Sequence, residues 1–233
     1  MHEHPGTVTS RRVTRHWPWV SGIVAVVVAV GLGALIFARH NGPFLFDQAW
    51  MGEVLEYRST WLDIPAFALN FLGGGWFSWI VVPLGTILTL VLVKRRWAAF
   101  YYALAVLLSV VAVQILKATF ERPRPEDILV LSDPGSFPSG HVANAATIAV
   151  SIALIFSRAW IWYVGAVYTV AMALSRTYLG AHWLSDTIGG ALIGAGIAVI
   201  VWAPLASRLD REGKGVPATD SKQLDLGSTT GSG

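Results

Sequence analysis

The chain has 233 residues, of which 54% are apolar and 13% are charged, and its net charge is +3. An ordinary soluble domain carries roughly a quarter charged residues, so this composition argues against a soluble protein and for membrane spans. Cysteine is absent, which excludes disulfides and thiolate metal sites.

Six apolar stretches follow one another along the chain. Five approach or exceed the length that crosses a bilayer core of about 30 Å, and the fourth is shorter but is flanked by polar motifs. The predicted spans are Trp19–Ala38, Trp76–Val93, Ala98–Leu116, His141–Phe156, Ala159–Leu179 and Trp183–Leu205. The first is longer than the apolar core of a signal peptide, so we expect a retained anchor. The sequence predicts an all-α polytopic membrane protein with six transmembrane helices.

The segment between the first two spans, Asn41–Gly75, is too polar to cross a membrane. Its apolar residues between Phe44 and Leu55 predict a helix that lies in the membrane interface. The following apolar run, Ile64–Leu72, is too short to span and ends at three glycines, so we expect it to be re-entrant or packed at the surface. The segment is either a structured connector or a lid over a substrate entry.

The first polar motif, Lys117-ATFERP-Arg124-Pro125, closes the third span. Pro123 and Pro125 prevent this helix from continuing. A structural interpretation is an ordinary helix stop whose cations reach the headgroups. A functional interpretation is an anion-binding cluster.

The second motif, Pro138-Ser139-Gly140-His141, immediately precedes the fourth span. Ser139 is suited to an N-cap, and free amides at a helix N-terminus attract anions. Glycine at position 140 lets a phosphate approach the backbone closely. A simple capped helix start is an equally good explanation of this motif by itself.

The third motif, Ser175-Arg176-TYLGA-His182-WLS-Asp186, joins the fifth and sixth spans. His182 and Asp186 are four positions apart, and we expect them to share a helix face. The carboxylate can then accept a hydrogen bond from one imidazole nitrogen and leave the other free to attack. A structural pair or two ligands of a metal site are the alternatives, and the metal is the weaker because cysteine and a further carboxylate at ligand spacing are missing.

Lysine and arginine accumulate on the cytoplasmic side of membrane spans. With the N-terminus inside, most of the 17 cations fall inside, and all three motifs fall outside. The inside cations are Arg11, Arg12, Arg15, Lys94, Arg95, Arg96, Arg158, Arg208, Arg211, Lys214 and Lys222. We therefore expect a cytoplasmic segment 1–18, a membrane domain 19–207 and a disordered cytoplasmic tail 208–233.

Taken together, the three motifs resemble the type 2 phosphatidic acid phosphatase family. Its pattern reads Lys, six residues, Arg-Pro; then Pro-Ser-Gly-His; then Ser-Arg, five residues, His, three residues, Asp. Every fixed position is filled between Lys117 and Asp186. The resemblance implies a metal-independent lipid phosphatase that needs no cofactor and forms a phosphohistidine. The residues that it implies are catalytic His182, His141 and Asp186, and phosphate-binding Lys117, Arg124, Ser139, Gly140 and Arg176.

In this family the histidine of the third motif attacks phosphorus, and that of the second protonates the leaving group. We expect lipid phosphates and membrane lipids as partners, and no nucleic acid. Undecaprenyl diphosphate in a bacterial plasma membrane is the first candidate substrate, ahead of phosphatidylglycerophosphate and phosphatidate. Arg122, outside the family pattern, is expected to favour a diphosphate. The alternatives are a non-catalytic lipid-binding protein on the same fold and a vanadate-dependent haloperoxidase.

Overall fold

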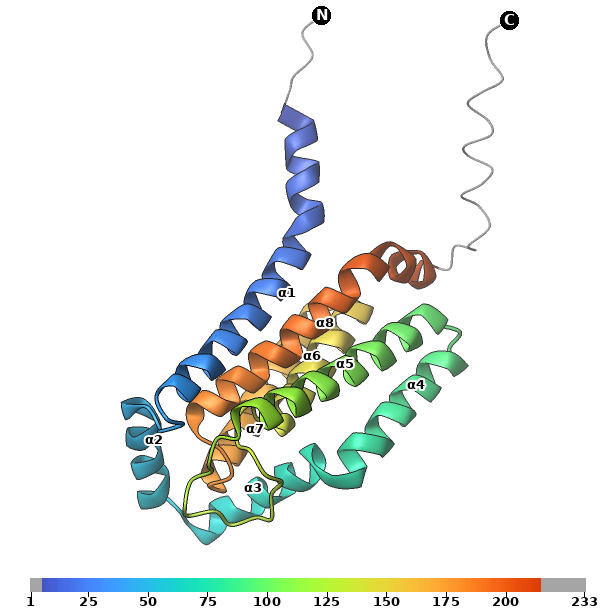
Figure 1. The fold of residues 1–233 in the computed structure, drawn as a ribbon. Helices are drawn as coiled ribbons and strands as arrows, with labels where there is room; N and C mark the ends of the chain where they lie inside the picture. Colours follow the sequence, from blue (N-terminus) through green and yellow to red (C-terminus); the bar gives the residue numbers. More distant parts are fainter. Residues whose placement is uncertain (1–5, 215–233) are drawn as a thin grey trace, which may run out of the picture.

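The computed structural model describes residues 6–214, which form eight α-helices and one π-helical stretch with no strand (Figure 1). The all-helical fold predicted from the sequence is confirmed. The elements are α1 (Gly6–Ala38), α2 (Leu45–Glu56), α3 (Thr60–Gly73), η1 (Phe77–Val81), α4 (Val82–Leu92), α5 (Arg96–Phe120), α6 (Gly140–Phe156), α7 (Ala159–Tyr178) and α8 (Leu184–Gly213).

Three helices are long and apolar enough to cross a membrane, namely α1 from Trp17, α5 and α8. A fourth crossing results if α3 and η1–α4, which meet at a bend of 44°, act as one broken span. The predicted count of six is therefore not confirmed. Helix α6 has 17 residues, or about 25 Å at the usual rise, which is less than a bilayer core of about 30 Å.

The long helices extend beyond the predicted spans at both ends of the chain. Helix α1 already begins at Gly6, inside the segment 1–18, and α8 continues to Gly213, inside the predicted tail. The Glu212 carboxylate accepts hydrogen bonds from the backbone N–H groups of Trp97 and Ala98, at 2.9 and 3.0 Å, and so joins the end of α8 to the start of α5. The rest of the predicted tail, from residue 215, lies outside the described residues.

The segment between α1 and η1 folds into two helices. The helix predicted between Phe44 and Leu55 is present as α2, and the apolar run Ile64–Leu72, for which no helix was predicted, lies within α3. Helix α2 packs against α7 and α8, and α3 packs against α7. Arg58, between α2 and α3, donates hydrogen bonds to the carbonyl oxygens of Tyr178 at 3.2 Å and Asp127 at 2.8 Å. The segment is therefore attached to the loops at the same end of the bundle (Figure 1).

Helix α8 lies at the centre of the bundle, where it contacts α1, α5 and α6. Its small residues allow this close packing. A Cβ added at Gly190 would overlap the carbonyl oxygen of Ser139, and one added at Gly194 would overlap that of Ala143. The start of α6 can therefore lie directly against α8.

Candidate active site

The three motifs meet at one end of the bundle, where α5 and α7 end and α6 and α8 begin (Figure 1). Helix α5 stops at Phe120 because Glu121 adopts a left-handed conformation (φ 43°) and two prolines follow. The loop then crosses the ends of the other helices. The backbone N–H of Ser139 donates to the carbonyl oxygen of Asp186 at 3.0 Å, so the second motif is joined to the third.

A cavity of about 220 Å³ lies between the motifs. It is lined by residues from α5, α6, α7, the two loops and the break before η1. The members that carry polar chemistry are Gln114, Lys117, Ser132, Asp133, Gly140, His141, Arg176 and His182. The sequence predicted five of these as site residues, and the structure places them around a single space.

Two of the cations share one counterion. Asp133, whose side chain is 57% exposed, lies 3.3 Å from Lys117 Nζ and 3.0 Å from Arg124 Nη2. Lys117 Nζ also donates to the carbonyl oxygen of Gly135 at 2.6 Å. An anion that binds Lys117 or Arg124 must therefore compete with this exposed carboxylate.

The third cation, Arg176, is buried and comes from the last turn of α7. Its Nη1 donates a hydrogen bond to Asn70 Oδ1 of α3, and its Nε has no hydrogen-bond partner among the described residues. Helix α3 therefore orients a motif residue, and Asn70 is a site neighbour that the sequence did not indicate. No motif spacing links positions 70 and 176.

Ser139 occupies the N-cap position of α6, as predicted, but its side chain makes no capping hydrogen bond. Its Oγ is buried without a partner among the described residues. A buried hydroxyl without a partner is costly, so this group is available to a ligand. Gly140 begins the helix and lines the cavity, which leaves the backbone there open to an anion.

The relation between His182 and Asp186 differs from the prediction. Helix α8 begins at Leu184, so His182 precedes the helix instead of sharing a face with Asp186. The reason is that Asp186 Oδ2 accepts the backbone N–H of Trp183 at 2.8 Å and so caps the helix after His182. His182 Nδ1 lies 3.7 Å from this oxygen, which is an ion-pair distance and too long for a hydrogen bond.

The tautomer of His182 follows from its neighbours. Its Nε2 lies 3.3 Å from Arg124 Nη1, and a guanidinium can only donate, so Nε2 presents a lone pair and Nδ1 carries the proton. Burial lowers the pKa of the His182 imidazole well below its usual value, and the positive charge of Arg124 lowers it further. His182 is therefore neutral near pH 7, with its basic nitrogen on the side of Arg124.

The role predicted for Arg122, favouring a diphosphate, is wrong. Its side chain is fully buried and donates to Asp186 Oδ1 at 2.6 Å, to Ser185 Oγ at 2.7 Å and to Asp47 Oδ2 at 3.0 Å. It does not line the cavity and is not placed to favour a diphosphate. The sequence missed this network because nothing local connects Asp47 with Arg122, which are 75 positions apart.

The structure offers no obvious metal site within residues 6–214. No group of three or more histidine, aspartate or glutamate side chains there is arranged to hold an ion. Two histidines and two carboxylates do occur at or near the cavity, but His182 faces Arg124, Asp186 is engaged by Arg122, and Asp133 pairs with Lys117 and Arg124.

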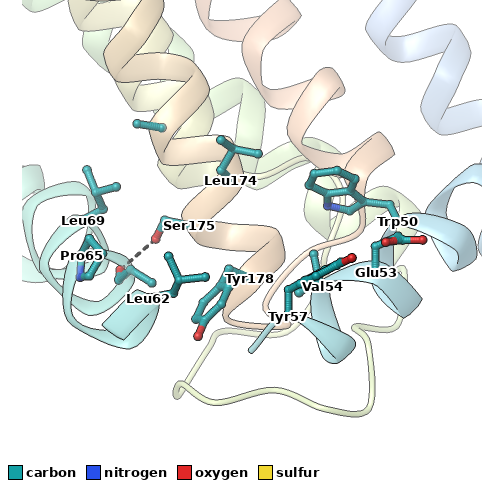
Figure 2. Close-up of a pocket in the computed structure, with 12 residues that line it drawn as sticks. Trp50, Glu53, Val54, Tyr57, Leu62, Pro65, Leu69, Leu174, Ser175 and Tyr178 are labelled. Carbon is teal, nitrogen blue, oxygen red and sulfur yellow. Dashed lines mark hydrogen bonds between the residues drawn. The ribbon is translucent and has the colours of Figure 1, made fainter. Parts of the chain in front are cut away.

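A second, larger hollow of about 540 Å³ lies between α2, α3 and α7. Figure 2 shows side chains of α2 and of the residue that follows it on one side of the hollow (Trp50, Val54 and Tyr57), and side chains of α3 on the other (Leu62, Pro65 and Leu69). Leu174 and Tyr178 of α7 lie between these two groups. Ser175 also lines this hollow, but its hydroxyl already donates a hydrogen bond to the carbonyl oxygen of Ala66. The hollow is mainly apolar, and Glu53 is the one charged residue among those that line it, so it offers no cation to an anionic group.

Comparison with known proteins connects this site with a family. Residues 98–208 match the family model described as the PAP2 superfamily. An undecaprenyl-diphosphatase of Sulfolobus acidocaldarius is 30% identical over 195 residues, which cover 80% of this chain and 90% of that protein. Phosphatidylglycerophosphatase B of Bacillus subtilis is 28% identical over 160 residues, which cover 64% of this chain and 77% of that protein.

Solved structures have the same fold. The PAP2-type phosphatidylglycerolphosphate phosphatase from Bacillus subtilis superposes with a TM-score of 0.67 at 21% identity, over 85% of this chain and 98% of that one. LpxE from Aquifex aeolicus superposes with a TM-score of 0.60 at 28% identity, over 68% of this chain and 95% of that one.

The close approach of Gly74, just before η1, to His141 leads to a testable prediction. A Cβ added at Gly74 would overlap His141 Nε2, although the backbone there (φ −131°) accepts any residue. We expect Gly74→Ala to displace the imidazole and to lower kcat by about tenfold or more, because small displacements of reacting groups are costly. Gly85→Ala in α4, where nothing lies within 4 Å, is the control. Unchanged kcat in Gly74→Ala, measured as phosphate release from a lipid phosphate, would contradict this role of the glycine.

Proposed function

Because the chain belongs to the PAP2 superfamily and is an integral membrane lipid phosphatase, we propose that it hydrolyses undecaprenyl diphosphate at the extracytoplasmic face of a bacterial plasma membrane, through a phosphohistidine. The observation that carries the mechanism is the single cavity that contains His182, His141, Lys117 and Arg176. Phosphoryl transfer needs little besides positioning and positive charge, and this cavity supplies both.

In the first step, the lone pair on His182 Nε2 attacks phosphorus. A nitrogen–phosphorus bond forms while the bond from phosphorus to the leaving oxygen breaks. His141, which also lines the cavity, gives its proton to that oxygen. The proton on His182 Nδ1 faces Asp186, whose negative charge stabilises the imidazole as it becomes positive.

In the second step, water attacks the phosphohistidine. His141 now takes a proton from the water, inorganic phosphate leaves, and His182 returns to its neutral form. With a lipid diphosphate, the other product is the lipid monophosphate. Neither step requires a metal, because cations of the chain face the developing negative charge.

The phosphoryl oxygens are proposed to bind Lys117, Arg124 and Arg176, with Ser139 and Gly140 at the start of α6. Preorganised donors of this kind stabilise charge as it develops in the transition state. The exposed carboxylate of Asp133 must give way when phosphate binds, because it contacts both Lys117 and Arg124.

The substrate assignment rests on charge and on the relatives. A diphosphate carries more negative charge than a monoester and gains more from a crowded cationic cavity. One relative is named an undecaprenyl-diphosphatase, whereas others are named phosphatidylglycerophosphatase B and lipid A 1-phosphatase. Phosphatidate and phosphatidylglycerophosphate are the alternative substrates within the same activity. A non-catalytic lipid-binding protein would not need two histidines at one anion site.

We test the mechanism with three substitutions. His182→Asn removes the nucleophile, so phosphate release should fall to background. His141→Ala removes the proton donor and should lower kcat by about 10² to 10⁴. Asp186→Asn misorients the nucleophile without removing it, so measurable activity should remain. All three are compared with the unmodified protein by phosphate release in detergent.

Two outcomes would contradict this mechanism. The first is turnover by His182→Asn at the wild-type rate. The second is loss of activity in EDTA that Mg²⁺ or Zn²⁺ restores, because activity should persist in chelator.

The substrate is tested with purified lipids. We expect the unmodified protein to show a higher kcat/KM for undecaprenyl diphosphate than for phosphatidate or phosphatidylglycerophosphate in the same detergent. A clear preference for either glycerolipid would refute the isoprenyl assignment and leave the lipid phosphatase activity intact.

The orientation is part of the proposal. The distribution of Lys and Arg supports six membrane crossings, cytoplasmic termini and an outward-facing site, although α6 is short. Since the chain has no cysteine, an impermeant thiol reagent should label Ser132→Cys in intact cells and Gly233→Cys only after permeabilisation. Labelling in the reverse pattern would overturn this orientation.

A further inference from the structure

A buried chain of charged side chains connects α2 with the nucleophilic histidine. Asp47 Oδ2 of α2 accepts a hydrogen bond from Arg122 Nη2 at 3.0 Å, and Arg122 Nη1 donates to Asp186 Oδ1 at 2.6 Å. The other oxygen of Asp186 lies 3.7 Å from His182 Nδ1. The Asp47, Arg122 and Asp186 side chains are each 0% exposed.

The charges in this chain do not cancel. Two carboxylates surround one guanidinium, so one negative charge remains in a site from which water is excluded. Charges interact strongly there, and removal of one partner leaves the other unpaired. With Asp47 present, Arg122 is neutralised from the side of α2, and Asp186 keeps its negative charge for His182. Without Asp47, Arg122 would cancel the charge of Asp186.

Asp47 also fixes the start of α8. Its Oδ1 accepts the backbone N–H of Ser185 at 2.8 Å, and its Oδ2 accepts the Ser185 hydroxyl at 2.7 Å. Ser185 immediately precedes Asp186 in the sequence. Asp47 therefore acts on Asp186 twice, once through the charge of Arg122 and once through the first turn of the helix that bears it.

We propose that Asp47 is a positioning residue of the phosphatase. It offsets the positive charge of Arg122 and, through Ser185, holds Asp186 directed toward His182, so that the net charge beside the imidazole is negative when the ring becomes positive on attack. Helix α2 is then a working part of the site and more than a connector between spans. The inference rests on the proposed role of His182 as the nucleophile.

Asp47→Asn tests the charge, because it keeps the size of the side chain. We expect kcat to fall by about 10- to 100-fold, as for other losses of alignment at a reacting group. KM should change little, because Asp47 does not line the cavity. The matched control is Glu56→Gln, which removes an exposed carboxylate from the same helix and should keep the wild-type kcat.

A double variant separates charge from mere structure. In Asp47→Asn/Arg122→Gln the guanidinium is removed together with the carboxylate that neutralises it. Because Asp47 acts on the charge beside His182 through Arg122, we expect the kcat of the double variant to equal that of Arg122→Gln alone. A structural role predicts a lower kcat than that of Arg122→Gln, since two losses in one buried network would lower kcat further than one.

If Asp47→Asn alone does not fold, the effect of this substitution can be measured in a protein that already carries Arg122→Gln. In the background of Arg122→Gln, Asp47→Asn should no longer lower kcat. Additive losses, or wild-type kcat in Asp47→Asn, would overturn the inference. Every protein is assayed on the lipid that the unmodified protein hydrolyses fastest, so the choice of substrate does not enter. Activity in His182→Asn would instead refute the proposed mechanism itself.

Discussion

The buried guanidinium of Arg122 determines how the catalytic end of this protein is assembled. A cation without access to water requires close counterions, and the chain provides them from two distant places, Asp47 in α2 and Asp186 in α8. Arg122 itself belongs to the loop after α5. Three separate elements, α2, the loop after α5 and α8, are thereby fixed to one another beside His182.

The opposite problem arises at the cavity, where cations must stay close together before any substrate is bound. Lys117 and Arg124 meet this constraint with carbonyl oxygens of the loop and with the exposed carboxylate of Asp133. Arg176 uses the neutral oxygen of Asn70. A counterion that is exposed can be displaced by phosphate, whereas the buried pairs of Arg122 cannot. The exposed ion pairs of Asp133 can thus give way to a ligand, whereas the buried ion pairs of Arg122 hold the surrounding elements together.

The two ring nitrogens of His182 face different partners. Nε2 faces Arg124 and the cavity, and Nδ1 faces Asp186 and the buried network. Burial and the neighbouring positive charge both lower the pKa of this imidazole, so it is the free base near neutral pH. A neutral ring with its lone pair toward the cavity is the form that the proposed nucleophile requires.

The sequence by itself determined the helical fold, the position of the longest apolar helices and five residues that line one cavity, because hydrophobic length and fixed motif spacing are local properties. It could not determine the ends of α1 and α8, the 44° bend between α3 and α4, or that His182 precedes its helix. The pairing of Asp47 with Arg122 was decided by the tertiary structure alone. Two charges 75 positions apart carry no mark in the sequence, and only the packing of α2 and of the loop after α5 against the start of α8 brings them together where water cannot separate them.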